Sequence, residues 1–245
     1  MFKRTLLIAL ILILLVTCLP ACSKEVNVDD PTMLELPGIK WNSTPEEVKE
    51  ALKLTEEQIL LDQQKETNGE DNAAWILCIT DVSFFTETLL MGQFTFVRYN
   101  DYEKFGLESV HLYYPDDIDM TAIRDNLTDL YGAGSAGMGN IQYRIIEGEL
   151  ESYTESMIST TSFDDQSEVM AKWWSSTAKY VDVLPSDVQE KITSMFNDPK
   201  YAAEYLTKQS AVTLACTNSM KEGASRNCVV FAANEYIALV QDFCK

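Results

Sequence analysis

The amino-acid sequence predicts an α+β fold in which helix-loop-helix pairs pack on an antiparallel β-sheet. Two stretches, 44–65 and 185–207, open on proline near capping residues and then place apolar residues at helical spacing. Between them lie segments rich in β-branched and aromatic residues, which is typical of strands. The order of helices followed by strands occurs in both halves, and a tandem duplication of one unit would produce it.

Residues 1–21 have the composition of a secretory signal peptide. Lys3 and Arg4 give a positive start, and the apolar run over 6–16 is too short to span a membrane. The signal ends in Leu19-Pro20-Ala21-Cys22, and this ending resembles the lipobox of bacterial lipoproteins. The resemblance implies that the chain is cut before Cys22 after a diacylglyceryl group has been attached to its thiol.

Residues 22–36 are expected to form a flexible tether, and residues 37–245 an α+β domain. A chain of this length would hold the domain about 20 Å from the membrane. Lipid anchoring gains about 0.8 kcal/mol for each buried methylene group, so stable attachment needs two or more acyl chains. The alternative to a single α+β domain is two subunits of similar fold with a boundary near 116–140, where a helix and a glycine-rich loop follow the first set of strands.

The first helix-loop-helix is predicted over 44–65. Ser43 or Thr44 can cap the helix, Pro45 fits the first helical turn, and two glutamates favour the positive end of the helix dipole. Thr55 provides a second cap, after which Ile59 and the two following leucines would form the apolar side of a second helix.

Strands are expected over 74–85, 88–99 and 107–114, and the last of these alternates apolar with polar residues. The segment Asp116-Asp117-Ile118-Asp119 then caps a helix over about 120–131, and Gly132 ends it.

The second half is predicted to continue with a strand over 141–155 and a helix over 168–182. Helices over 185–196 and 199–207 and strands over 211–217 and 228–240 complete it. The helix start at 185–192 aligns with the one at 45–52, which is the pattern expected of a duplication, although two unrelated amphipathic helices would also share it.

A short segment after the tether carries a second resemblance. Residues 38–48 read Gly-Ile-Lys-Trp-Asn-Ser-Thr-Pro-Glu-Glu-Val. This segment resembles the opening of uncharacterised bacterial lipoproteins of the β-lactamase-inhibitor-protein and outer-membrane-assembly-lipoprotein type, with Asn42 in place of their usual glycine. The resemblance implies helices on a curved antiparallel sheet, sometimes in tandem, and a binding or scaffolding module without catalytic residues.

Composition excludes some partners. The chain has 38 acidic and 19 basic residues and a net charge of −19, which opposes binding to nucleic acid. Four cysteines follow Cys22, and Cys216 and Cys228 flank a predicted turn, so they are the better pair for a disulfide. The alternative is four buried thiols.

No catalytic, cofactor or metal motif has its required context. The glycines at 132, 134 and 137 follow a helix rather than a strand, and Ser176-Thr177-Ala178-Lys179 lacks its companion motifs. The single histidine, His111, lies on the polar side of its strand and is expected at the surface. The acidic clusters at 116–119 and 164–165 lack a calcium loop, so we expect no metal and no cofactor.

These observations predict a non-enzymatic lipoprotein that is anchored to the membrane on its extracytoplasmic face and binds a protein or peptide partner. Ser23 would favour the outer membrane in a cell with two membranes. An envelope protein that binds a sugar or peptide is the alternative, with Trp173 and Trp174 as candidate contacts. A carboxylate-based hydrolase is a third option, because paired acids are recognised only in space.

Overall fold

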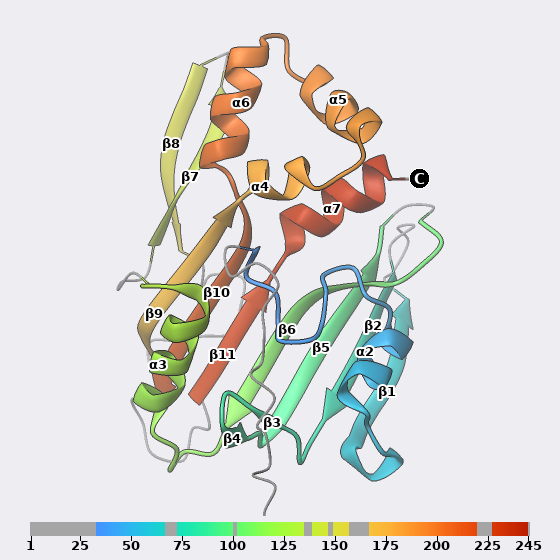
Figure 1. The fold of residues 1–245 in the computed structure, drawn as a ribbon, viewed down its shortest axis with the longest axis vertical. Helices are drawn as coiled ribbons and strands as arrows, with labels where there is room; N and C mark the ends of the chain where they lie inside the picture. Colours follow the sequence, from blue (N-terminus) through green and yellow to red (C-terminus); the bar gives the residue numbers. More distant parts are fainter. Residues whose placement is uncertain are drawn as a thin grey trace, which may run out of the picture.

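The structure is a computed structural model, and it describes residues 33–66, 73–99, 102–134, 139–146, 149–156, 167–219 and 227–244. The described part contains six α-helices and a seven-stranded antiparallel sheet with the strand order β1-β2-β5-β6-β11-β10-β9 (Figure 1). The predicted α+β class is therefore confirmed. The sheet joins both halves of the chain, because β6 is hydrogen-bonded to β11.

The sheet strands are β1 (Ile59–Glu66), β2 (Ala73–Ile79), β5 (Met91–Arg98), β6 (Gly106–Tyr114), β9 (Ser167–Ser176), β10 (Ser210–Ser219) and β11 (Asn227–Ala232). Two further antiparallel pairs lie outside this sheet: β3 (Ser83–Phe84) with β4 (Glu87–Thr88), and β7 (Gly139–Ile146) with β8 (Glu149–Ser156). The helices are α2 (Pro45–Leu52), α3 (Met120–Tyr131), α4 (Thr177–Asp182), α5 (Ser186–Ser194), α6 (Pro199–Lys208) and α7 (Asn234–Phe243). A single 3-10 turn, η2 (Glu56–Gln58), precedes β1.

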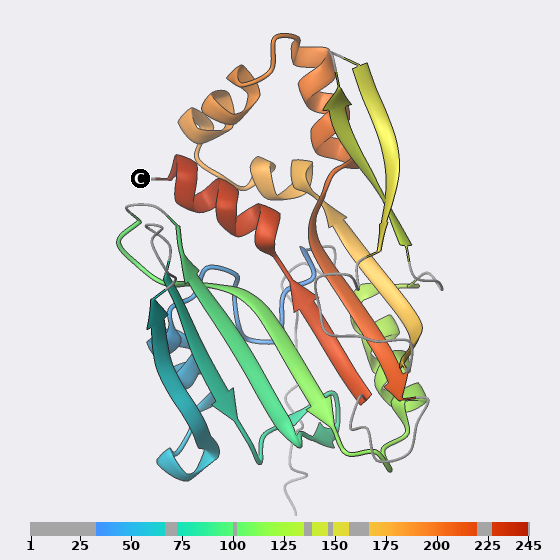
Figure 2. The same ribbon diagram turned by 180° about the vertical axis from the view of Figure 1, so that it is seen from behind.

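The helices are distributed unevenly around the sheet. In Figure 1, α2, α3 and the segment that precedes α2 lie in front of the strands, whereas α4 to α7 gather beyond one end of the sheet. Seen from behind, the strands themselves are in front, with no described helix over them (Figure 2). One face of the sheet is therefore packed, and the other carries no helix of the described part.

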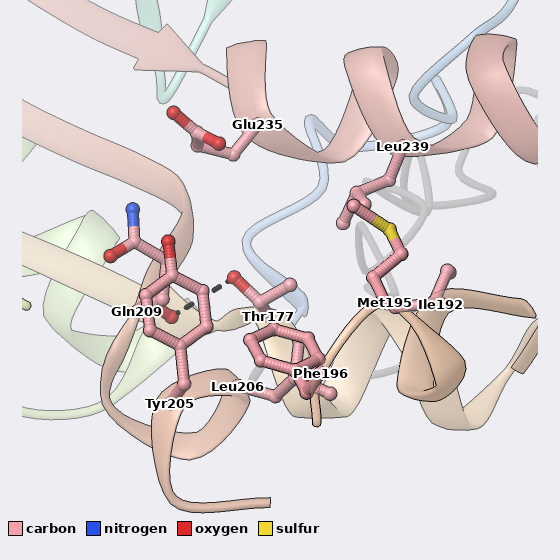
Figure 3. Close-up of a pocket in the computed structure, with 9 residues that line it drawn as sticks. All are labelled: Thr177, Ile192, Met195, Phe196, Tyr205, Leu206, Gln209, Glu235 and Leu239. Carbon is pink, nitrogen blue, oxygen red and sulfur yellow. Dashed lines mark hydrogen bonds between the residues drawn. The ribbon is translucent and has the colours of Figure 1, made fainter. Parts of the chain in front are cut away.

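The four helices beyond the sheet form a small layer of their own. Val181, Val188, Ile192 and Leu206 make up its buried centre, which is separate from the main core. The same helices surround an apolar pocket (Figure 3).

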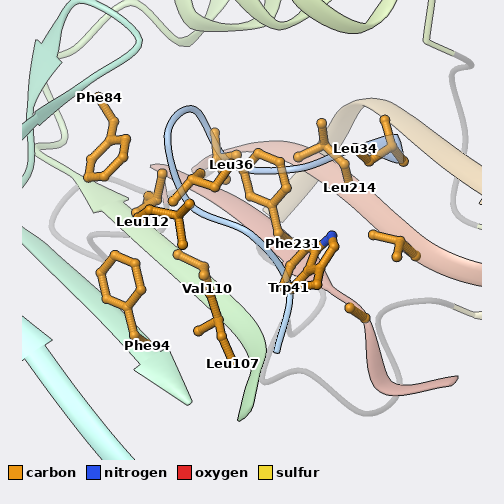
Figure 4. Packing of buried hydrophobic residues seen from close by; sticks show 14 of the residues in the cluster. Leu34, Leu36, Trp41, Phe84, Phe94, Leu107, Val110, Leu112, Leu214 and Phe231 are labelled. Carbon is orange, nitrogen blue, oxygen red and sulfur yellow. The ribbon is translucent and has the colours of Figure 1, made fainter. Parts of the chain in front are cut away.

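The main core lies on the packed face of the sheet. A row of directly paired residues crosses six of its strands and is almost completely buried: Leu77, Phe94, Val110, Phe231, Leu214 and Trp173. Figure 4 shows Leu34, Leu36 and Trp41, from the segment before α2, packed against this part of the sheet. Burial of large apolar side chains from these six strands is the main source of stability.

Local signals in the sequence explain the helices that were predicted correctly. Thr44 accepts a hydrogen bond from the Glu47 backbone N–H at 3.3 Å, and the Glu47 carboxylate accepts one from the Thr44 N–H at 2.8 Å. Asp119 accepts from the N–H of Thr121, and α3 covers the predicted 120–131 without a shift. The predicted helix pair at 185–207 is also present, as α5 and α6.

The predicted second helix over 55–65 is wrong. Thr55 does start a turn, because its N–H donates to Gln58 Oε1 at 3.0 Å, but the turn ends after η2 and the chain continues as β1. β1 pairs with β2 along its length, and Leu60 at 57 % and Leu61 at 36 % exposure lie at the edge of the sheet. Strand pairing therefore overrides a locally helical pattern.

The predicted helix over 168–182 is also wrong, since β9 occupies its first part and α4 only the last six residues. Pairing with β10 along the strand places consecutive residues on opposite faces. The predicted strand over 228–240 ends at Ala232, and α7 follows. Ile237, Val240 and Gln241 are buried at helical spacing on α7. The predicted strand over 141–155 is a hairpin of two strands, β7 and β8.

The domain begins earlier than predicted. Met33, Leu34 and Leu36 belong to the predicted tether, but they are only 8 %, 2 % and 2 % exposed and pack in the main core. The Tyr131 hydroxyl donates to the Glu35 carbonyl at 2.6 Å, which fixes this segment to the end of α3. The signal peptide, Cys22 and the tether up to residue 32 lie outside the described residues.

Candidate functional site

The uncovered face of the sheet is the candidate site, and we call it the open face. Because side chains alternate along a strand and directly paired residues share a face, the strand register assigns every side chain to one face. The open face includes four rows that run across the strands, and the fourth, next to the first, joins Lys65, Ala74, Val97 and Gly106.

The first row of the open face has a floor of small side chains. It runs through Gln63, Ile76, Thr95, Ser109, Ala232, Thr213 and Trp174. The four central residues are small and half-buried, and the indole of Trp174 is 50 % exposed at one end. Small residues between larger ones allow another molecule to approach the sheet closely.

The second and third rows are larger and more apolar. The second runs through Leu61, Cys78, Gln93, His111, Val230, Ala215 and Lys172, and the third through Met91, Tyr113, Cys228 and Thr217. Six of these side chains are 8 % exposed or less: Cys78, Val230, Ala215, Lys172, Cys228 and Thr217. The accessible part of the two rows is therefore Leu61, Gln93, His111, Met91 and Tyr113. Tyr113 and His111 lie side by side in the middle of the face. Their ring centroids are 6.1 Å apart, and the Tyr113 hydroxyl lies 3.3 Å from His111 Nδ1.

The open face differs in charge from the chain as a whole. The chain has 38 acidic residues, yet the four rows contain no aspartate or glutamate and only two charged residues, the exposed Lys65 and the buried Lys172. Acidic residues of neighbouring strands point the other way: Asp62 of β1 accepts from Trp75 Nε1 at 2.6 Å and from Lys49 Nζ of α2 at 2.9 Å on the packed side. The four rows therefore form a surface without acidic side chains on an acidic protein.

His111 and Tyr113 are uncharged hydrogen-bonding groups near neutral pH. Burial lowers the pKa of His111, so the imidazole is neutral there. Burial, followed by the nearby Cys228 and Cys78, raises the pKa of the Tyr113 phenol to about 12. The sequence predicted His111 on the polar side of its strand, and the structure places it on that side, half-buried in the middle of the open face.

The two tryptophans predicted as ligand contacts have different roles. Trp173 is 5 % exposed on the packed face, and its Nε1 donates to the Gly132 carbonyl at 2.7 Å. Trp174 lies on the open face and is half exposed. The structure therefore retains Trp174 as a candidate contact and places Trp173 in the core.

The predicted disulfide between Cys216 and Cys228 is absent, because both are buried free thiols. The register pairs Cys216 with Val229 and Cys228 with Thr217, so the two side chains point to opposite faces of the sheet. Burial raises the pKa of Cys216 to about 12 and also raises that of Cys228. Both thiols act as small buried side chains.

The remaining motifs have structural roles where they are described. Gly132 ends α3 with a φ of 81°, and Ser176 to Lys179 join β9 to α4. Across the described ranges, no three His, Cys, Asp or Glu side chains are grouped to hold a metal ion. No described helix has the length and apolar character needed to span a membrane.

Comparison with known proteins gives no match to a protein-family model, a curated protein or a solved structure. The resemblance of residues 38–48 to lipoprotein openings therefore stays a prediction. Asn42 has a φ of 64°, in the left-handed region that glycine and asparagine tolerate best, so asparagine is suited to the position where that pattern has glycine.

Proposed function

We propose that this protein is a lipid-anchored, extracytoplasmic binding protein that recognises a protein or peptide partner through the open face, without catalysing a reaction. The anchor is the thiol of Cys22, as the lipobox implies. The observation that supports the binding role is the open face, whose four rows contain no acidic residue and over which no described helix lies.

The chemistry of the open face is that of a protein interface. The centres of such interfaces are depleted in charged residues and enriched in aromatic residues and methionine. The open face shows both properties, since Met91, Tyr113 and Trp174 lie among uncharged side chains. Solubility alone does not explain this pattern. The chain has 38 acidic residues and a net charge of −19, and a face that only had to stay soluble could carry some of these acidic residues.

The position of the tether supports the same proposal. The described chain starts at Met33, in a segment that packs on the core side of the sheet, whereas the open face is on the other side. A lipid attached at Cys22 would therefore anchor the domain from its packed side, and the open face would stay accessible to a partner.

Photocrosslinking in the native host tests the binding role. A photoreactive amino acid is introduced at Thr95 or Thr213 on the open face and, as a control, at Asp129 on the exposed side of α3. We expect one discrete crosslinked protein from both open-face positions and none from Asp129. The same crosslinks from all three positions, or none from the open face, would contradict the proposal.

Fractionation tests the anchor separately. The substitution Cys22→Ser removes the thiol that would carry the lipid, so the protein should leave the membrane fraction. Cys244→Ser is the matched control, because it removes a half-buried thiol far along the chain and should leave the protein membrane-bound. Membrane association that survives Cys22→Ser would refute lipid anchoring at this residue.

A further inference from the structure

The pocket between α4, α5, α6 and α7 is a second site, away from the open face. It has a volume of about 330 Å³, which lies in the range of small-molecule sites. Folded interiors contain few voids larger than a water molecule, so a pocket of this size is more than a packing defect. Figure 3 shows the side chains around it, with Leu239 of α7 on one side and Phe196 and Leu206 on the other. The chemistry of this wall decides which ligand fits.

Most of the described wall is apolar. Ile192 of α5 and Leu206 of α6 are 1 % and 6 % exposed and belong to the buried centre of the helical layer. Tyr205 and Leu239 pack against the same centre. An ion that moved from water into such surroundings would lose its hydration shell, whereas an uncharged apolar molecule would gain by leaving water. The wall therefore favours an uncharged apolar ligand.

Two aromatic rings lie along one side of the pocket. The ring of Phe196, just after α5, and the ring of Tyr205 on α6 have centroids 5.4 Å apart and a tilt of 47°. Both side chains are half-buried, so the two rings are not closed off by the core. Aromatic rings attract one another in tilted and offset arrangements of this kind. A flat aromatic ligand would extend the pair, which a saturated ligand of the same size could not do.

The polar residues of the described wall do not change this preference. Thr177 is buried, and its N–H and hydroxyl both donate to the Gln209 carbonyl, at 2.8 and 3.1 Å. These two donors are therefore already used within the protein. Glu235, in the first turn of α7, is exposed to solvent and lies at the rim. Size, shape and aromatic character are left to select the ligand.

The volume sets the size of the ligand. A cavity of about 150 Å³ lined by leucine, isoleucine and phenylalanine holds one benzene molecule. The pocket has about twice that volume and a similar lining, so it has room for about two rings. A single ring would leave part of the wall without contacts. Met195 is 64 % exposed at the rim, and its flexible side chain can follow the outline of the ligand.

We propose that this pocket binds an uncharged aromatic molecule of about two fused rings. The rings would lie between Leu239 of α7 and the pair formed by Phe196 and Tyr205, with Ile192 and Leu206 as the buried wall. This site is separate from the open face, and the proposal does not depend on the partner proposed for that face.

Three neutral probes test the ligand class on the full chain, with isothermal titration calorimetry as the measurement. 2-Naphthol, phenol and decahydro-2-naphthol each carry one hydroxyl group and differ in the number and the aromatic character of their rings. We expect phenol to bind about tenfold more weakly than 2-naphthol, because it buries less apolar area. Decahydro-2-naphthol should bind about fivefold more weakly, because it cannot stack on the two rings. Absence of 2-naphthol binding, or binding no tighter than that of either other probe, would overturn the proposal.

Substitutions locate the binding in this pocket. Phe196→Leu keeps an apolar side chain but removes one ring, so it should weaken 2-naphthol about fivefold and leave decahydro-2-naphthol unchanged. Met195→Trp places a large ring at the rim and should weaken both probes at least about tenfold.

Val183→Trp is the matched control for Met195→Trp. Val183 is also 64 % exposed, lies in the same helical layer and is outside the described wall, so the new ring should not affect binding. Because both tryptophans replace exposed residues, we expect folding to be little affected. Equal affinity for 2-naphthol in Met195→Trp and Val183→Trp would refute binding at this site.

Discussion

The side chain of Gln241 joins the C-terminal helix to the sheet, and its loss gives the sharpest test of how this fold is held together. Gln241 is fully buried on α7. Its Oε1 accepts from the Tyr99 N–H at 2.8 Å, and its Nε2 donates to the Val97 carbonyl at 3.0 Å and to Asn42 Oδ1 at 3.4 Å. One amide therefore connects α7, the end of β5 and the turn before α2.

The substitution Gln241→Met keeps the length of the side chain and removes its hydrogen bonds. A buried backbone group that loses its partner costs about 1–3 kcal/mol, and the substitution leaves the Tyr99 N–H and the Val97 carbonyl without theirs. The Tyr99 N–H is only partly buried, so its contribution lies at the low end of this range. For the two groups together we expect a loss of about 3 kcal/mol in the free energy of unfolding. For a domain of this size, that corresponds to a decrease of about 6–12 °C in the melting temperature.

Urea denaturation followed by circular dichroism measures this loss. The control is Gln189→Met on α5, where the same amide donates to the carbonyls of Leu184 and Asp182 at 2.8 and 3.2 Å, near solvent. Water can replace those bonds, so the control should lose less than about 1 kcal/mol. Similar losses in the two variants would refute the argument that burial makes the Gln241 contacts important.

A second substitution tests whether these contacts act as one unit. A Cβ at Gly106 would lie 1.9 Å from Asn42 Oδ1 and 3.0 Å from Gln241 Nε2. Gly106→Ala should therefore disrupt the same network, and its loss should be less than additive with that of Gln241→Met. Full additivity would show that the two positions do not share this network.

Three further predictions follow from burial. Trp173→Ala should destabilise the protein by about 3–5 kcal/mol and Trp174→Ala by less than about 1 kcal/mol, and equal losses by circular dichroism would refute their opposite orientation. Burial raises the pKa of Glu108, although the Tyr99 hydroxyl donates to its carboxylate. The folded state thus binds the proton of the Glu108 carboxyl group more tightly than the unfolded state, and the stability falls as the pH rises through the raised pKa. Glu108→Gln should therefore raise the urea midpoint at pH 7 but not at pH 4. Because burial raises the pKa of Cys216 to about 12, its thiol should react with Ellman's reagent only after unfolding, which mass mapping would show.

Much of the fold follows from local signals. The capping residues Thr44 and Asp119 fix the starts of α2 and α3, and alternation over 107–114 predicts β6, in which Val110 and Leu112 are fully buried. These predictions succeed because capping bonds and side-chain alternation depend on neighbours in the sequence.

The errors occur where distant strands decide the local conformation. The segment 55–65 has a helical start but becomes the edge strand β1, because β2 offers it a complete ladder of hydrogen bonds. The stretch around Trp173 becomes β9 for the same reason, with β10 as its partner. Met33 and Leu36 were assigned to the tether because a short apolar pattern does not reveal a core that forms elsewhere in the chain.

The candidate site could be predicted only in part. Trp174 was singled out in the sequence, but the rest of the open face was not, because its rows combine residues from strands far apart in the chain. The pocket was missed altogether, since it needs the side-by-side packing of α5, α6 and α7. One signal was available: Ile237 and Val240 recur at helical spacing in a stretch that was predicted as a strand.

The sequence by itself determined the fold class, the starts of most helices and the acidic character of the chain, because these depend on residue type and spacing along the chain. Only the tertiary structure decided which face of the sheet carries no described helix, that Cys216 and Cys228 point apart, and where the helices α4 to α7 enclose an apolar pocket. Pairing register and helix packing are set by contacts between distant residues, and a sequence pattern carries no record of them.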